Sequence, residues 1–116
     1  MLTCYLKYGP AATVPECRDM ATSMGTSDIL LLKNHGVLTA GRSIAEAFTR
    51  LWYITKAAEI QVQAMSSPNA IEAVELIDQK TVKYYKNSRF IKIVADSEFA
   101  HQMRLVDRDL PGYNDM

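Results

Sequence analysis

The segment ILLLKNHGVLTA, residues 29–40, carries the strongest structural signal in the chain. A short, continuous apolar run bounded by turn residues predicts a strand over 29–32 that is buried on both faces. Asn34-His35-Gly36 follows and predicts a turn, because Asn and Gly both tolerate positive φ. Val37–Ala40 reads as a second strand, closed by Gly41. We therefore predict a β-hairpin.

Helices are predicted on both sides of this hairpin. Before it, Val14-Pro15-Glu16 begins a short helix, since Pro is tolerated in a first turn, and Gly25 ends it. After it, Ser43 and Glu46 have capping-box spacing and begin a long helix that reaches about Met65. That spacing favours a capping role for Ser43 over a nucleophilic one.

The outer segments give weaker signals. Residues 1–12 read as an irregular lead-in, and residues 70–86 as a helix. Residues 90–94 suit either a strand or a helix, because periodicity does not distinguish them. A last helix is expected to open at Ser97-Glu98 and to break at Leu110-Pro111-Gly112.

Two strands are too few for an isolated sheet. A two-stranded hairpin is marginally stable alone. The apolar edges of strand 29–32 invite pairing with another strand. We infer that part of the sheet is missing or comes from a partner, and we expect a homo-oligomer or contacts with a missing N-terminal half.

Composition narrows the class of protein. Hydrophobic residues make up 48% of the 116 residues, which disfavours disorder. Lys plus Arg and Asp plus Glu number 13 each, so the basic excess of a nucleic-acid binder is absent. There is no apolar run of membrane-spanning length and no convincing signal peptide, so we expect no membrane partner. Cys4 and Cys17 are expected to be reduced thiols of a cytoplasmic protein, with Cys17 buried.

His35 is the main candidate for chemistry. Flanking Asn and Gly leave room for its imidazole to point into a cleft at a sheet end, and neutral imidazole is a common ligand for zinc. A lone histidine in a turn is more often structural. The chain's other histidine, His101, is expected to face solvent or cap a helix. The basic run over residues 80–92 is expected to be a solvated face, with anion or partner binding as the alternative.

Residues 29–48, from the apolar strand through Asn-His-Gly to the helix start Glu46-Ala47-Phe48, resemble the class II aldolase/adducin family. The similarity is strongest over 28–65 and extends to weaker echoes at 105–108 and 111–113. The resemblance implies an α/β fold, namely a partial three-layer α/β/α class II aldolase-like domain that is mostly helical and has a short β-hairpin. It also implies that residues 1–116 are the C-terminal portion of a domain about twice as long.

The resemblance also implies a metal centre. Enzymes of the family bind a divalent metal, commonly zinc, through three histidines, and the histidine of the Asn-His-Gly turn falls on His35. The metal polarises a substrate carbonyl and stabilises an enediolate during aldol cleavage or epimerisation of a small sugar-phosphate or hydroxy-carbonyl compound. Tyr113 matches a C-terminal catalytic tyrosine by position only, and packing of the tail is an equally good explanation.

One departure limits the functional prediction. The His-x-His motif that supplies the other two ligands does not occur in these 116 residues, nor is the family's acid/base residue identified. A catalytic zinc needs about three protein ligands, so we expect no tight metal binding and no activity from this chain alone. The chain is then a fragment, a truncated product or a degenerate relative. The alternative is a non-catalytic, adducin-like protein-binding module.

Overall fold

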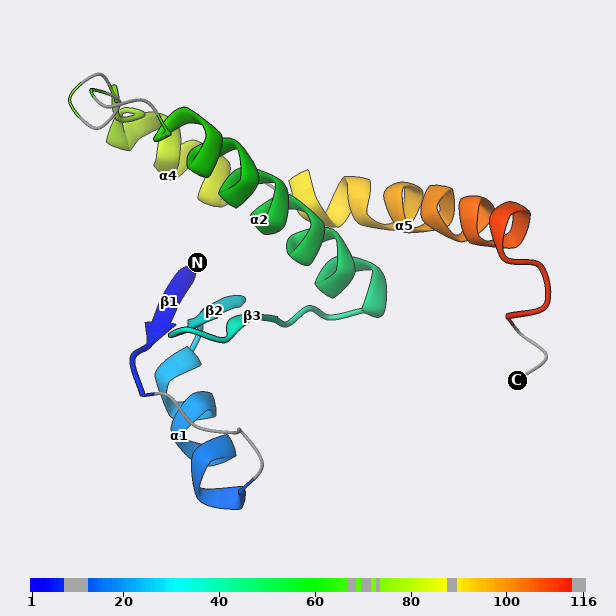
Figure 1. The fold of residues 1–116 in the computed structure, drawn as a ribbon, viewed down its shortest axis with the longest axis horizontal. Coiled ribbons are helices and arrows are strands. Elements are labelled where there is room, and N and C mark those ends of the chain that lie inside the picture. Colours follow the sequence, from blue (N-terminus) through cyan, green and yellow to red (C-terminus); the bar gives the residue numbers. More distant parts are fainter. Residues whose placement is uncertain (8–12, 67–68, 70–71, 73, 88–89, 114–116) are drawn as a thin grey trace. The chain divides into compact units, whose positions relative to one another are not determined.

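The computed structural model describes residues 1–7, 13–66, 69, 72, 74–87 and 90–113. The chain divides into two compact units, Met1–Arg42 and Ser43–Met116. The first contains β1 (Leu2–Tyr5), α1 (Val14–Met24), β2 (Ile29–Leu32) and β3 (Gly36–Thr39). The second contains α2 (Ile44–Ala64), α4 (Gln79–Asn87) and α5 (Phe90–Asp109), all labelled in Figure 1. The chain is thus mixed α/β, as predicted.

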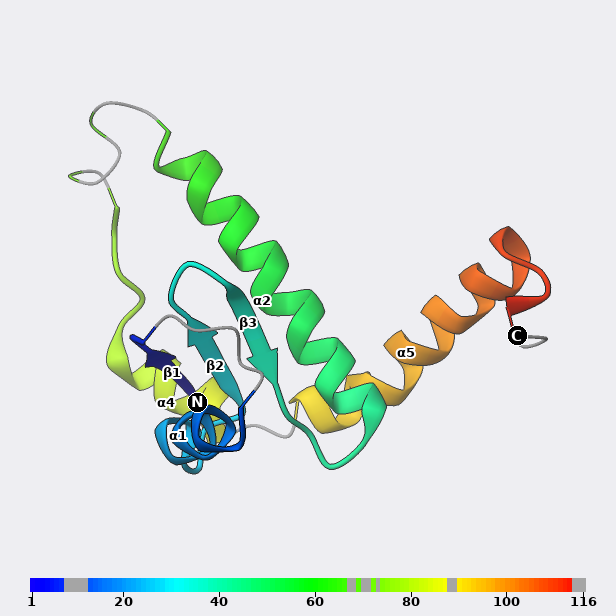
Figure 2. The same cartoon turned by 60° about the horizontal axis from the view of Figure 1, so that its bottom comes forward.

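The first unit is built on a three-stranded sheet in the order β1-β2-β3 (Figure 2). The predicted hairpin is confirmed: β2 and β3 are antiparallel, with Leu30 opposite Leu38. The prediction of an irregular lead-in over 1–12 is wrong for Leu2–Tyr5, because β1 pairs with β2 in parallel, with Leu2 opposite Ile29, and residues 8–12 lie outside the described residues. This pairing joins segments far apart in sequence, so the local pattern around Leu2 does not reveal it.

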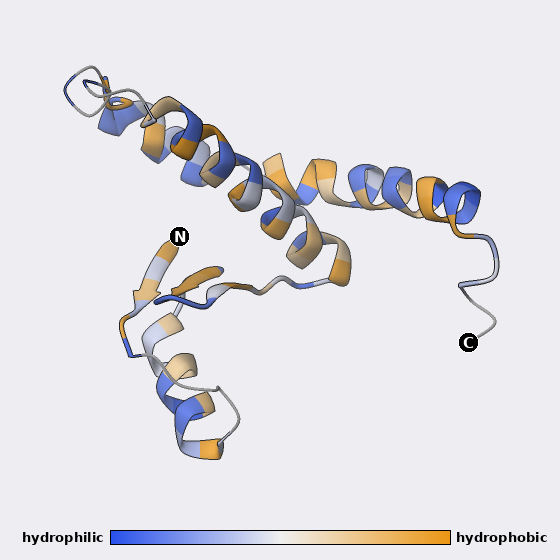
Figure 3. Cartoon of the chain, in the orientation of Figure 1, coloured by the Kyte–Doolittle hydropathy of each residue, from blue (hydrophilic) through white to orange (hydrophobic). Residues whose placement is uncertain are grey.

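Helix α1 covers one face of this sheet. Its buried Met20 packs with Tyr5 and with Leu30, whose exposed fraction is 0%. The predicted start and stop are confirmed: Thr13 caps the helix, Pro15 lies in its first turn, and Gly25 follows its end with φ 53°. The other face of β2 is only half-buried, so the prediction that both faces are buried is correct for one face. Figure 3 shows how apolar β2 is along its length.

Helix α2 begins where the sequence predicts. The backbone N–H of Glu46 donates to Ser43 Oγ over 3.1 Å, which confirms the capping role of Ser43. Two edge-to-face ring contacts join α2 to α5: Phe48 lies 5.4 Å from Phe99, and Tyr53 lies 6.2 Å from Phe90, measured between ring centroids. These contacts form the apolar interface of the second unit.

The predicted helix over 70–86 is interrupted: Glu72 is helical, but the helix that is described further on begins only at Gln79. Residues 70, 71 and 73 lie outside the described part of the chain, and residues 74–78 have no regular structure. Asp78 explains the later start, because its Oδ1 accepts from the N–H groups of Lys80 and Thr81, each over 2.9 Å. A carboxylate in this position satisfies free N–H groups at a helix start. Helix α4 therefore begins at Gln79.

Helix α5 corrects two further expectations. The ambiguous segment 90–94 is helical, and the last helix begins at Phe90 rather than at Ser97. Ser97 does not cap a helix, because its Oγ donates to the carbonyl of Val94 over 2.9 Å within α5. The predicted break is confirmed, since α5 ends at Asp109 and Gly112 has φ 93°.

Both cysteines are exposed, and neither is part of a disulfide. The predicted burial of Cys17 is therefore wrong: α1 meets the sheet through Met20 and Met24, and Cys17 lies one turn before them. Among the described helices, none combines the length and apolarity needed to cross a membrane.

Candidate functional site

His35 lies in the tight turn between β2 and β3. Its backbone N–H donates to the carbonyl of Leu32 over 3.1 Å. Asn34 before it has φ 56°, and Gly36 after it has φ 156°. Asn and Gly adopt such angles at low cost, so the local sequence builds this turn directly. The side chain of His35 is exposed and therefore accessible to a ligand.

The parallel pairing of β1 and β2 sets the position of the turn. Tyr5 and Leu32 are the last residues of the two strands and lie opposite each other, and the Lys33 N–H donates to the Tyr5 carbonyl over 3.0 Å. His35 thus lies just beyond the carboxyl end of β2, at the edge where the parallel strand β1 also ends. Ligands of open α/β sheets bind at such carboxyl edges.

Basic side chains accompany His35 at this edge. Lys33 precedes the turn, and Lys7 follows β1; both are exposed. Sequence reasoning missed them, although the position of Lys33 next to the Asn-His-Gly turn was a usable signal. Lys7 was not predictable as a neighbour, because nothing in the sequence indicated that β1 exists.

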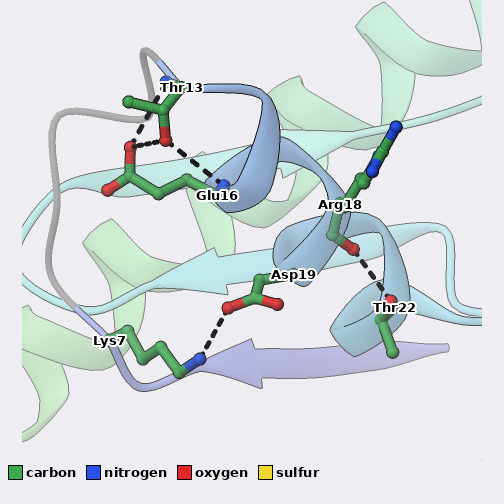
Figure 4. A network of polar contacts seen from close by, with 6 residues as sticks. All are labelled: Lys7, Thr13, Glu16, Arg18, Asp19 and Thr22. Carbon is green, nitrogen blue, oxygen red and sulfur yellow. Dashed lines mark hydrogen bonds and ion pairs between the residues drawn. The ribbon is translucent and has the colours of Figure 1, made fainter.

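Lys7 is already paired. Figure 4 shows its Nζ donating to Asp19 Oδ2 of α1, over 2.6 Å. The hydrogen bond to Asp19, and secondarily the charge of that carboxylate, raise the pKa of Lys7 above its ordinary 10.5. Lys33, by contrast, forms no ion pair with any described residue. Its ammonium is therefore the free positive charge beside the turn.

The described residues do not complete a metal site. Nowhere in the described ranges do three His, Cys, Asp or Glu side chains gather so as to hold a metal ion. His35 has the donor type and accessibility of one ligand, but a whole metal centre does not fit the side chains that this part of the chain supplies.

Tyr113 belongs to the second unit, whereas His35 belongs to the first. Tyr113 is half-buried in a helical turn after α5, and its N–H donates to the Leu110 carbonyl over 3.3 Å. Its partial burial is compatible with the packing explanation, and its catalytic role stays a prediction. His101 is exposed on α5, as expected.

The basic run is solvated where it is described. Lys80, Lys83 and Lys86 of α4 and Lys92 of α5 are exposed, and Arg89 lies outside the described residues. The expectation of a solvated basic face is confirmed for these four lysines.

Residues 3–62 match the family described as "Class II Aldolase and Adducin N-terminal domain". Human beta-adducin is 42% identical over 55 residues, covering 47% of this chain and 8% of the adducin. A Pseudomonas aeruginosa protein whose name places it among class 2 aldolases is 40% identical over 58 residues, covering 50% of this chain and 22% of that protein.

Two further similarities extend over nearly the whole chain. A Caulobacter vibrioides protein, also named for class 2 aldolases, is 27% identical over 109 residues, covering 92% of this chain and 42% of its own length. The crystal structure of an aldolase II superfamily protein from Pseudomonas syringae superposes with a TM-score of 0.74 at 21% identity, over 94% of this chain and 44% of that chain. This chain thus spans less than half of each of these relatives.

The match over residues 3–62 covers more than half of the 116 residues and includes β2, all of β1 except Leu2, and the His35 turn. The fold likeness agrees with it. The chain therefore belongs to the class II aldolase and adducin family.

Proposed function

We propose that this chain is the C-terminal portion of a class II aldolase-like domain in which His35 supplies one ligand of a divalent metal site. The complete domain would cleave or epimerise a small sugar-phosphate or hydroxy-carbonyl compound. The observation that carries this proposal is the exposed imidazole of His35 on a turn just beyond the carboxyl end of β2. A histidine placed for packing would instead be covered by its neighbours.

The backbone favours a ligand role for His35. The Leu32 hydrogen bond and the positive φ of Asn34 restrict the turn, so the imidazole projects from a defined point. Metal ligands benefit from this preorganisation, because less conformational entropy is lost when the ion binds. Lys33 supports the substrate class, since an unpaired ammonium beside the turn suits an anionic group such as phosphate.

The remaining ligands and the acid/base residue would come from outside this chain, because the described residues gather no set of three side chains that could hold a metal. We therefore expect this chain alone to bind metal weakly and to be inactive. Zinc or another divalent ion would be held only in the complete domain.

The alternative is an adducin-like module that binds a protein partner without a metal. The identity to human beta-adducin, 42%, supports it as well as the 40% identity to the Pseudomonas aeruginosa relative supports the enzyme. A single candidate ligand is also what a non-catalytic relative would retain.

A chimera separates the two proposals. This chain would replace the matching region of the Caulobacter vibrioides relative. The alignment of the two proteins covers 92% of this chain. Metal content would then be measured by mass spectrometry for the chimera and for its His35→Ala and His101→Ala variants. The second variant is a matched control, because both histidines are exposed.

The enzyme proposal expects bound metal that disappears in His35→Ala and persists in His101→Ala. Metal that persists without His35 would refute the ligand assignment. A folded chimera that binds no metal would favour the adducin-like module. Stoichiometric, tight zinc binding by the 116-residue chain itself would contradict the expectation of an incomplete site.

We also propose that the chain associates, either as a homo-oligomer or with an N-terminal half. The outer strands β1 and β3 each have one edge that pairs with no strand in the described part of the chain. Helix α2 exposes large apolar side chains, including Leu51, Trp52, Ile60 and Val62. Light scattering should show a species larger than a monomer, and a well-folded monomer at every concentration would refute association of the chain with itself.

A further inference from the structure

A small recess lies between α2 and α5 in the second unit. Its lining residues come from both helices: Phe48, Thr49, Trp52, Tyr53, Glu98 and Gln102. The space within it is about 10 Å³, which is room for the centre of one water-sized group. Trp52 and Glu98 are exposed, so the recess is open to solvent.

The hydroxyl of Thr49 lacks a partner in this recess. Thr49 is 2% exposed, and its Oγ1 makes no hydrogen bond to any described group. A threonine inside a helix commonly bonds to the carbonyl four residues earlier, but this one does not. Leaving a buried hydroxyl unpaired destabilises the fold, so a ligand that bonds to it would be favoured.

Two polar groups of α5 face the same recess. Glu98 and Gln102 are four residues apart, which places them on one face of the helix. Neither side chain forms an ion pair or hydrogen bond with the described residues. The carboxylate, the amide oxygen and the Thr49 hydroxyl are all acceptors. The recess therefore offers several acceptors and one negative charge.

Aromatic rings form the opposite wall. Trp52 and Tyr53 meet edge to face, 5.1 Å apart with an interplanar angle of 89°, and Phe48 lies beside them. The faces of such rings attract cations through their negative π electrons. The acceptors and the rings thus favour the same kind of ligand, a small cation that donates hydrogen bonds.

We propose that this recess binds a primary ammonium head group. An ammonium has three N–H donors for the three acceptors and is close to water in size. Glu98 repels anions, and a quaternary ammonium is too large and has no N–H to donate. The ammonium belongs either to a free small amine or to a lysine side chain of a partner. The proposal does not depend on the role of His35.

Trp52 allows a direct test, because it is the chain's only tryptophan. Methylammonium chloride would be titrated into the 116-residue chain while the intrinsic fluorescence is recorded, with sodium chloride as the ionic-strength control and tetramethylammonium chloride as the size control. We expect a saturable change with methylammonium only. An equal response to sodium chloride or to tetramethylammonium overturns the proposal.

Two variants locate the binding site. Glu98→Gln keeps the shape of the side chain and removes its charge, and it should weaken methylammonium binding at least about fivefold. Thr49→Val removes the unpaired hydroxyl, and it should weaken binding roughly threefold without reducing the unfolding midpoint. The matched control is Asp96→Asn, which removes the same charge from an exposed residue of α5 outside the recess.

Binding by Asp96→Asn should equal that of the unmodified chain. Unchanged binding by Glu98→Gln overturns the proposal. A short peptide with one central lysine distinguishes the two sources. Tighter binding of the peptide than of methylammonium assigns the recess to a partner's lysine, and weaker binding assigns it to a free amine. Failure of both to bind overturns the proposal.

Discussion

Thr13 and Glu16 cap the start of α1 reciprocally. The N–H of Glu16 donates to Thr13 Oγ1 over 3.4 Å, and the N–H of Thr13 donates to Glu16 Oε2 over 3.3 Å. Figure 4 shows both contacts, together with the bond from the Thr22 hydroxyl to the Arg18 carbonyl further along the helix. The two bonds between Thr13 and Glu16 satisfy N–H groups that have no backbone partner at the start of a helix. The Arg18 carbonyl, by contrast, lies within the helix and also takes part in its backbone hydrogen bonding.

Thr13→Ala should therefore lower the free energy of unfolding by about 1 kcal/mol. Thr22→Ala is the matched control, because it removes a threonine hydroxyl from the same helix without exposing a helix end. It should be neutral or slightly stabilising, since alanine favours helix. Urea denaturation followed by far-ultraviolet circular dichroism compares the two. Equal losses would show that the cap contributes nothing.

Leu30 and Leu38 face each other across β2 and β3 but differ in burial, at 0% and 38% exposed. Leu30→Ala would leave a cavity beneath α1 and should cost about 3 kcal/mol of unfolding free energy. Leu38→Ala removes the same atoms from a partly solvated position and should cost less than about 1 kcal/mol. Denaturant midpoints measure both, and similar losses would contradict the burial of Leu30.

Asn34 has a left-handed backbone conformation next to His35, with φ 56°. Asn34→Gly should preserve the turn, with a stability change within about 0.5 kcal/mol, because glycine adopts positive φ freely. Asn34→Val should cost about 1–2 kcal/mol, since a β-branched residue resists this conformation. Amide exchange in β2 and β3 reports the hairpin. If the two variants exchange alike, the turn does not require the left-handed residue.

Asp78 makes the start of α4 sensitive to acid. Its hydrogen bond from the Thr81 hydroxyl, followed by that from the Thr81 N–H, lowers the pKa of Asp78 below the ordinary 3.8. The folded pKa is the lower one, so the carboxylate's stabilising contribution is complete above pH 3.8 and is lost as the pH falls through the folded value.

We therefore expect the backbone chemical shifts of residues 79–82 to remain helical as the pH falls to 3.8 and to move toward coil only below it. Asp78→Asn should remove this acid step, and Thr81→Val should move it upward toward 3.8, because the variant lacks the largest cause of the shift. An acid step that survives in Asp78→Asn must come from another group.

Local signals explain which elements were predictable. The turn at Asn34, the cap at Ser43 and the stop at Gly25 each depend on a residue type that acts within four residues of its own position, and the structure confirms all three. The position of His35 in a turn could also be predicted, because the two residue types that permit the turn, Asn and Gly, directly flank the histidine.

Long-range contacts explain what was missed. Leu2–Tyr5 is a strand only because it pairs with β2, and Lys7 reaches the site edge only through β1. The start of α5 was missed for a related reason: Phe90 contacts Tyr53 of α2, and periodicity within 90–94 does not reveal this contact. The interruption of the predicted helix over 70–86 at residues 74–78 was missed, because the capping role of Asp78 at the start of α4 was not recognised.

The parallel pairing of β1 with β2 has a consequence for synthesis. Leu2 pairs with Ile29, so β1 leaves the ribosome before the strand that it joins has emerged. At 5–20 residues per second, the delay is roughly one to five seconds. During that interval the apolar side chain of Leu2 and the unpaired edge of β1 are open to other nascent chains, whereas β2 and β3 close their hairpin within microseconds of emerging.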